Sequence, residues 1–160
     1  MSENCFPENF GHVAGIVPQA DGAITSDIVS LKNANKAWVK VVLNQTNAAQ
    51  STTTLMQAQD VSGTGGKAIS SNVPIWANQD LASDDRLTRQ ADAKTFQFSA
   101  TLKQKVVWFQ IDPAQCMDIN NGFDCIYITS GGSNAANIIA ASFFLNPKYE
   151  GATLPSFIID

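Results

Sequence analysis

The sequence predicts an all-β protein, an antiparallel β-sandwich of the jelly-roll type with extended arms at both ends. Short runs of β-branched and aromatic residues recur along the 160-residue chain, and residues typical of turns separate them. No helical period lies between these runs, which argues against a parallel α/β sheet. The clearest run, Lys105–Ile111, stops at Asp112-Pro113, as a buried strand followed by a turn would.

The expected strands follow one another with short loops between them. In the second strand, alternation places Val39, Val41 and Leu43 on one face. The charged stretch Asp80–Ala93 is expected to be a loop or to hold one helical turn, and Asn120-Asn121-Gly122 is a strong turn signal. In chain order, we expect strands at Ser26–Leu31, Ala37–Asn44, Gln50–Gln59, Ala68–Ser71, Val73–Asn78, Thr95–Ala100, Val106–Asp112, Phe123–Thr129 and Ile138–Leu145, and a helical turn at Pro113–Met117.

These elements form one expected domain with two flanking segments. The β-sandwich domain spans residues 26–148, the N-terminal arm residues 1–25 and the C-terminal tail residues 149–160. The arm is rich in Pro, Gly and Asn, yet apolar residues are spaced along it, which is unlike plain disorder. The tail ends in an apolar run of the kind that usually docks on protein. We expect the β domain to fold without residues 1–20.

The surface is expected to carry few charges. Charged residues make up 15% of the chain, against an average of about 25%. Such a surface is either simply neutral or suited to contacts with other proteins, because few charges lose water on binding. The net charge of −4 and the lack of Lys or Arg clusters exclude nucleic acid as a main partner. No apolar run reaches the roughly 20 residues of a membrane span, and the N-terminus has no secretory features, so we expect no membrane partner and cytosolic synthesis.

The three cysteines, Cys5, Cys116 and Cys125, are odd in number and lack CxxC spacing. With His12 as the only histidine, they make a poor zinc site. We expect reduced, partly buried thiols. A Cys116–Cys125 bridge and an intermolecular link through Cys5 are the alternatives.

No combination of residues predicts catalysis, and we expect no enzyme activity, no cofactor and no metal. His12 lies in the glycine-containing arm, a poor place for a rigidly held base. The acidic residues between Asp80 and Asp92 are interspersed with Arg86 and Arg89 and are expected to form local ion pairs. An interface role for the two arginines is the favoured interpretation.

Two loops resemble ligand-binding motifs only in part. Asp118, Asn120 and Asp124 are spaced like some calcium ligands, but no glycine or glutamate lies at the expected EF-hand positions. A plain Asn-Gly turn is favoured there, with calcium binding as the alternative. Val61–Ala68 departs from the phosphate-binding loop at both ends of the motif, so we expect a flexible hairpin loop.

The three tryptophans, Trp38, Trp76 and Trp108, each lie in an expected strand. Large aromatic side chains usually belong to the core, and we expect these three there. If they were exposed together, they would form a platform for sugar binding.

A family resemblance supplies what these residue types do not. The chain resembles a family of small proteins encoded beside the major capsid gene of tailed bacteriophages, over roughly residues 26–150. The resemblance lies in the whole pattern and brings no functional residues with it. The segments that carry it are Val29–Val39, Asn72–Asn78, Val107–Pro113, Asn121–Ile126 and Ser133–Ile138.

This resemblance implies a virion structural protein that decorates and stabilises the phage head. The expected partners are the major capsid protein and further copies of the chain itself in a homotrimer, and the expected location is the capsid surface after synthesis in the bacterial cytoplasm. A head–tail connector, a tail component and a carbohydrate-binding module are the alternatives. The residues expected at the interface are Phe6, Phe10, Val13, Ile16, Arg86, Arg89, Phe157 and Ile158.

Overall fold

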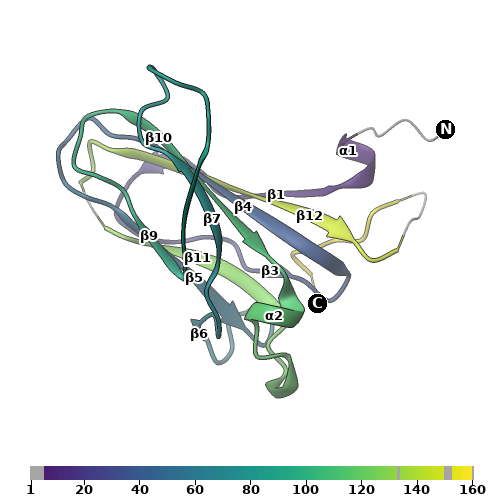
Figure 1. Cartoon of the computed structure of the whole chain (residues 1–160). Coiled ribbons are helices and arrows are strands. Elements are labelled where there is room, and N and C mark those ends of the chain that lie inside the picture. Colours follow the sequence, from purple (N-terminus) through teal and green to yellow (C-terminus); the bar gives the residue numbers. More distant parts are fainter. Residues whose placement is uncertain (1–5, 133, 150–152, 160) are drawn as a thin grey trace.

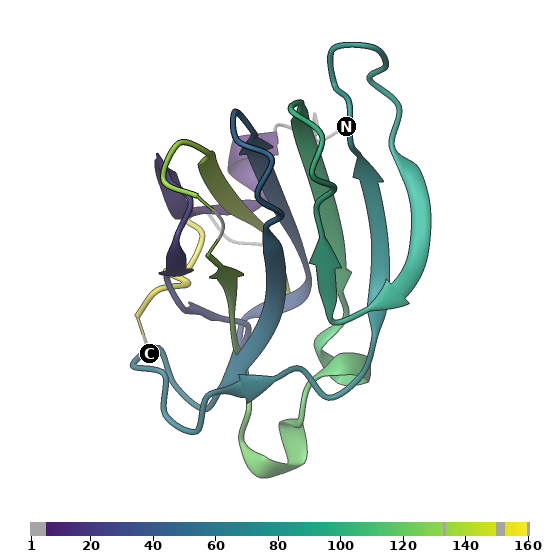
Figure 2. The same ribbon diagram turned by 90° about the vertical axis from the view of Figure 1, so that its left-hand side faces the viewer.

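The computed structural model describes residues 6–132, 134–149 and 153–159. Over these residues the chain is an antiparallel β-sandwich, as predicted, with two sheets face to face (Figure 1). The larger sheet has the strand order β1-β12-β4-β10-β7-β8, and the smaller has β2-β11-β5-β6, with β3 added to β11 and β9 to β5. Figure 2 shows the two layers with the helical turns outside them.

The elements have these bounds: α1 (Phe6–Asn9), β1 (Gly11–Ala20), β2 (Ala23–Thr25), β3 (Val29–Ser30), β4 (Ala34–Asn44), β5 (Thr52–Ala58), β6 (Lys67–Ala68), β7 (Val73–Asn78), β8 (Thr88–Ala93), β9 (Thr95–Gln97), β10 (Gln104–Ile111), α2 (Pro113–Cys116), the 3-10 turn η1 (Ile119–Asn121), β11 (Cys125–Gly131) and β12 (Ile138–Pro147).

The core lies between the sheets because one face of each central strand is apolar. In β10, Val107, Phe109 and Ile111 are fully buried, and so are Ile126 and Ile128 of β11 in the smaller sheet. Burying one side chain of this size stabilises the fold by about 1.5–3 kcal/mol. The alternation predicted for residues 37–44 is confirmed, since its inward-facing members are all buried.

The expected boundary at residue 25 is wrong for the folded unit. β1 is an edge strand of the larger sheet, paired with β12 from Gly11 opposite Leu145 to Ala20 opposite Ile138. Its Ile16 is 3% exposed and belongs to the core. Two register irregularities interrupt the β1–β12 pairing, so the strand shows no simple alternation in the sequence. Residues 11–25 are therefore part of the sandwich, and the pairing of β1 with β12 argues against folding without residues 1–20.

Two other segments also differ from a plain loop or tail. The second half of the charged stretch at residues 80–93 is β8, which pairs with β7 at the other edge of the larger sheet. In the C-terminal tail, Phe157 is 5% exposed and accepts a hydrogen bond at its carbonyl from the Ser30 amide, 2.7 Å away. Both ends of the chain thus pack on the sandwich at the β1 side.

The turn chemistry follows the sequence closely. Pro113 begins the short helix α2, and Gly122 ends the following 3-10 turn with a φ of 80°. Cys116 and Cys125 are buried thiols, whereas Cys5 lies outside the described residues. No helix in the described part of the chain is long and apolar enough to cross a membrane.

Candidate functional site

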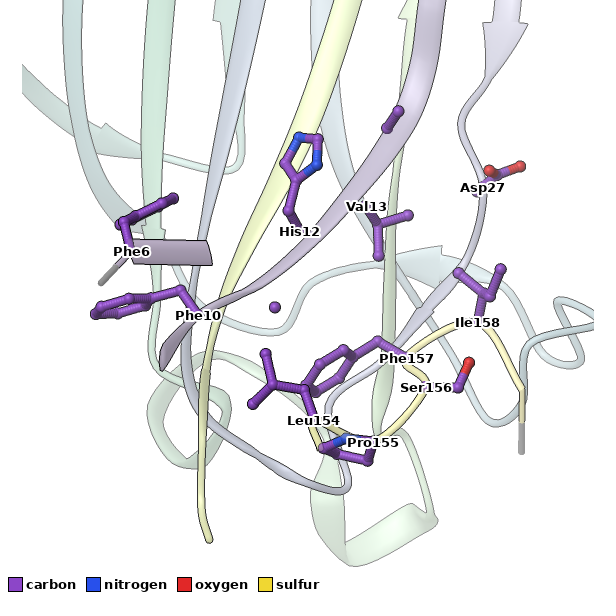
Figure 3. Close-up of a pocket in the computed structure, with 12 residues that line it drawn as sticks. Phe6, Phe10, His12, Val13, Asp27, Leu154, Pro155, Ser156, Phe157 and Ile158 are labelled. Atoms are coloured by element: carbon purple, nitrogen blue, oxygen red, sulfur yellow. The ribbon is translucent and has the colours of Figure 1, made fainter. Parts of the chain in front are cut away.

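The two ends of the chain form a groove beside the β1 edge of the sandwich. We call it the terminal groove; it has a volume of about 680 Å³. Apolar side chains from the start and the end of the chain dominate its lining. Figure 3 shows Phe6 and Phe10 of the N-terminal segment on one side of the groove and Leu154, Pro155 and Phe157 of the tail on the other. Its lining residues are Phe6, Phe10, Gly11, His12, Val13, Ala14, Asp27, Leu154, Pro155, Ser156, Phe157 and Ile158.

Close packing fixes the shape of this groove. A Cβ atom at Gly11 would lie 2.3 Å from the Phe157 ring, so only glycine allows the tail to pack this closely on β1. Phe6 and Phe10 stack on each other with centroids 5.0 Å apart. Phe6 and Ile158 remain 50% and 51% exposed, which leaves apolar surface for a partner to cover.

The structure brings together five of the eight residues that the sequence suggested for an interface. Phe6, Phe10, Val13, Phe157 and Ile158 all line the terminal groove. Ile16, the remaining apolar residue of the suggested set, is instead a core residue of β1.

The two arginines suggested for an interface lie elsewhere. Arg86 is exposed and pairs with Asp84 at 2.8 Å. Arg89 lies on β8, where its guanidinium covers the Trp76 ring at 4.9 Å from the centroid and also pairs with Asp92. These arginines belong to the far edge of the larger sheet and not to the groove.

The expectation that the three tryptophans are core residues is wrong. Trp38, Trp76 and Trp108 are all partly exposed, because each shares the outer face of the larger sheet and not the face toward the smaller one. Trp108 and Trp76 are opposite each other on β10 and β7. We call the set Phe6, Phe10, Trp38, Phe144, Trp108 and Trp76 the aromatic row.

Ring contacts connect much of the aromatic row across the sheet. Phe144 lies at 5.5 Å from Trp108 in a stacked arrangement and at 5.6 Å from Phe6. Phe10, the residue after α1, meets Trp38 edge-on at 6.2 Å, so the N-terminal segment covers one end of the row. His12 packs against Phe144 at 5.2 Å and is exposed, so it belongs to this surface.

The acidic residues considered for metal binding or catalysis face cations. Asp118 accepts a hydrogen bond from Lys67 at 2.6 Å, and this contact is the main cause of the lowered pKa of Asp118. Asp124 lies 3.9 Å from Lys32. Asp80 pairs with Lys103 at 3.0 Å, and this contact is likewise the first cause of its lowered pKa. Within the described ranges, no three His, Cys, Asp or Glu side chains gather as a metal site would require.

Lys105 is a buried ionisable residue that is not among the candidate residues suggested by the sequence. Its side chain is fully buried, and its ammonium donates to Gln45 Oε1 at 2.7 Å, to the Ser99 carbonyl at 2.5 Å and to Ser99 Oγ at 3.0 Å. All three acceptors are neutral, so burial lowers the pKa of Lys105. The alternation along β10 indicates this direction. Lys105 lies two and four residues before Val107 and Phe109, so its side chain is on the same, inward face of the strand.

The chain matches no protein-family model and no curated protein in sequence. Among solved structures, it is similar to the SPBc2 prophage-derived protein YomS, at 8% identity over 85% of this chain and 92% of that chain, with a TM-score of 0.48. A carbohydrate-binding module specific for non-crystalline cellulose, CBM28, matches at 10% identity over 84% and 65%, with a TM-score of 0.30. A chain of infectious bursal disease virus, Gt strain, matches at 10% identity over 92% and 42%, with a TM-score of 0.25. At such identities and TM-scores, no shared function follows from these similarities.

Proposed function

We propose that the chain is a virion structural protein that decorates and stabilises the capsid of a tailed bacteriophage. It acts without catalysis, through contacts with the major capsid protein on the capsid surface and with its own copies in a homotrimer. The resemblance of residues 26–150 to proteins encoded beside major capsid genes supports this role. The low charge of the chain, 15% of its residues, is consistent with it, because little desolvation opposes binding to another protein.

The terminal groove is the observation that carries the proposal. It gathers apolar side chains from both ends of the chain beside an edge strand and leaves Phe6 and Ile158 half exposed. Apolar surface of this kind on a soluble protein marks a contact site for another protein. A rigid sandwich that holds both termini in one place presents a preformed surface, which reduces the ordering cost of binding.

Stabilisation of a capsid follows from mass action. A protein that binds only the assembled shell favours that state by an amount that grows with its concentration over its dissociation constant. Many weak contacts repeated over the capsid surface therefore add up, even though one copy contributes little. No chemistry beyond surface contact is needed for this role.

A capsid-binding assay with groove variants tests the proposal. Ile158→Asp places a charge in the groove, and Phe6→Ala removes one ring from its wall. We expect each variant to weaken binding to undecorated capsids at least tenfold while the thermal unfolding temperature stays close to that of the wild type. Leu102→Asp is the matched control, because Leu102 is 57% exposed and precedes β10 at the opposite end of the strands from Gly11.

Equal binding by all four proteins would remove the groove from the proposal. Failure of the wild type to bind capsids at all would contradict the decoration role itself. Binding confined to the portal vertex or to tails would instead favour a head–tail connector or a tail component.

A further inference from the structure

The outer face of the larger sheet carries a strip of aromatic rings that the capsid role does not use. Phe144, Trp38, Trp108 and Trp76 lie on the adjacent strands β12, β4, β10 and β7. Neighbouring strands are about 4.8 Å apart, so this part of the aromatic row spans roughly 14 Å. All four side chains are partly exposed. The sheet holds them in fixed register, so together they form a rigid aromatic strip. Phe6 and Phe10 contact Phe144 and Trp38 at one end, and the Arg89 guanidinium lies over the Trp76 ring at the other.

Polar groups lie between these rings. Lys40 is opposite Ser142 on one side and Trp108 on the other, and its ammonium is 5.7 Å from the centre of the Trp108 ring. Gln110 is opposite Trp38. Hydrogen-bond donors and acceptors therefore alternate with aromatic rings along the strip. Both kinds of group lie on the outer face of the central strands, where alternate residues point.

The charge of this face is opposite to that of the chain as a whole. The chain has a net charge of −4, yet the charged side chains on the outer face of β12, β4, β10 and β7 are Lys36 and Lys40. Among the described residues, Lys40 forms no ion pair with a carboxylate. Asp112, which follows β10, lies near Lys36, whereas Lys40 has no carboxylate partner in the described part of the chain. Lys40 is therefore the cation available at the centre of the strip.

This combination fits one class of ligand. The CH groups of a pyranose ring pack on the electron-rich face of an aromatic ring, while its hydroxyls need donors and acceptors beside that ring. A carboxylate on the ligand would pair with Lys40. Nucleic acid also combines rings with negative charge, but it needs several cations along its backbone. The four strands of this strip offer two lysines, and Arg89 at its edge is paired with Asp92.

We propose that the outer face of the larger sheet binds an acidic polysaccharide, with a sugar ring on Trp108 and a carboxylate on Lys40. The N-terminal segment limits the strip at one end, because Phe6 and Phe10 cover Phe144 and Trp38. The site meets the terminal groove only at its covered end, where Phe6 and Phe10 belong to both, and it does not depend on the capsid role.

Isothermal titration calorimetry with alginate oligosaccharides as the polyuronate tests this inference, with dextran and oligo(dT) as comparison ligands. We expect the full-length protein to bind alginate in preference to both, and added salt to weaken the binding. Trp108→Ala and Lys40→Met should each weaken it at least tenfold, and Lys40→Arg should keep it. Tyr149→Ala and Lys103→Met are matched controls, because Tyr149 is 73% exposed outside the sheets and Lys103 pairs with Asp80.

Absence of alginate binding by the wild type would overturn the inference. So would binding that Trp108→Ala and Lys40→Met leave unchanged, equal binding of dextran, or tighter binding of oligo(dT). Circular dichroism and thermal unfolding check each variant. If Trp108→Ala does not fold, Lys40→Met decides the result, since it changes a partly exposed side chain.

Discussion

Single buried groups in this protein tie distant segments together and make its stability depend on pH. Cys116 ends α2 and is 2% exposed. Burial, and secondarily the charge of Asp112, raises the pKa of its thiol from 9.0 to about 11. The folded state therefore keeps this proton at pH values where the unfolded chain loses it.

The Cys116 thiol should weaken the fold at alkaline pH. A pKa raised in the folded state contributes stability that is fully present below pH 9 and is lost as pH rises through 11. A shift of this size corresponds to about 2–3 kcal/mol. Denaturant unfolding between pH 8 and 11 should show a steeper loss of free energy of unfolding for the wild type than for Cys116→Ala. Identical slopes for the two proteins would contradict this explanation.

A second residue-scale prediction concerns the glycine in the middle of β1. A Cβ atom at Gly15 would lie 2.3 Å from the ring of Phe143, which is fully buried and cannot move without disturbing the core. Gly15→Ala should lower the free energy of unfolding by about 1–3 kcal/mol. Gly22→Ala is the control, because no heavy atom lies within 4 Å of its added Cβ, and it should change stability by less than about 0.5 kcal/mol. Equal effects in chemical denaturation would show that Phe143 does not fix this position.

The sequence contained more information on side-chain direction than its residue types suggest. Parity along a strand places Lys105 with Val107 inside the sandwich, and it places Trp108 outside. Size alone predicts a core position for the tryptophans, because large aromatic side chains are usually buried. In the structure the position along the strand determines burial more than side-chain type does, since the tryptophans are partly exposed and the lysine is fully buried.

At the scale of elements, the central strands could be predicted and the edges could not. β4, β10 and β12 have clear apolar alternation, because both neighbouring strands and the opposite sheet constrain them. β1 and β8 lie at the edges of the larger sheet, where irregular pairing and exposed side chains obscure the pattern. The terminal groove was predictable only as a set of apolar residues, since nothing in the sequence places the tail beside β1.

A pair of truncations tests how the N-terminal segment divides. Removing residues 1–10 takes away α1 but leaves β1, so cooperative unfolding should remain with a small fall in the unfolding temperature. Removing residues 1–20 deletes β1, uncovers β12 and takes Ile16 from the core. That variant should lose several kcal/mol of stability or fail to fold. Thermal unfolding followed by circular dichroism measures both, and equal unfolding temperatures would show that β1 is dispensable.

At the scale of the whole molecule, the two proposed binding roles use two different parts of the sandwich. The terminal groove lies at the β1 edge and collects both ends of the chain, whereas the open part of the aromatic row lies on the outer face over β4, β10 and β7. A decorating subunit can hold a capsid through one surface and keep the other turned toward solvent. The fold class followed from the recurrence of short strands, but the separation of these surfaces depends on how the sheets pack.

The most direct test of the proposed decoration role is the copy number of the chain in purified phage virions. Quantitative mass spectrometry should find it in an amount that is a large fraction of the major capsid protein. A few copies per particle would contradict decoration and favour a connector or a tail component. Complete absence from virions would contradict a structural role altogether.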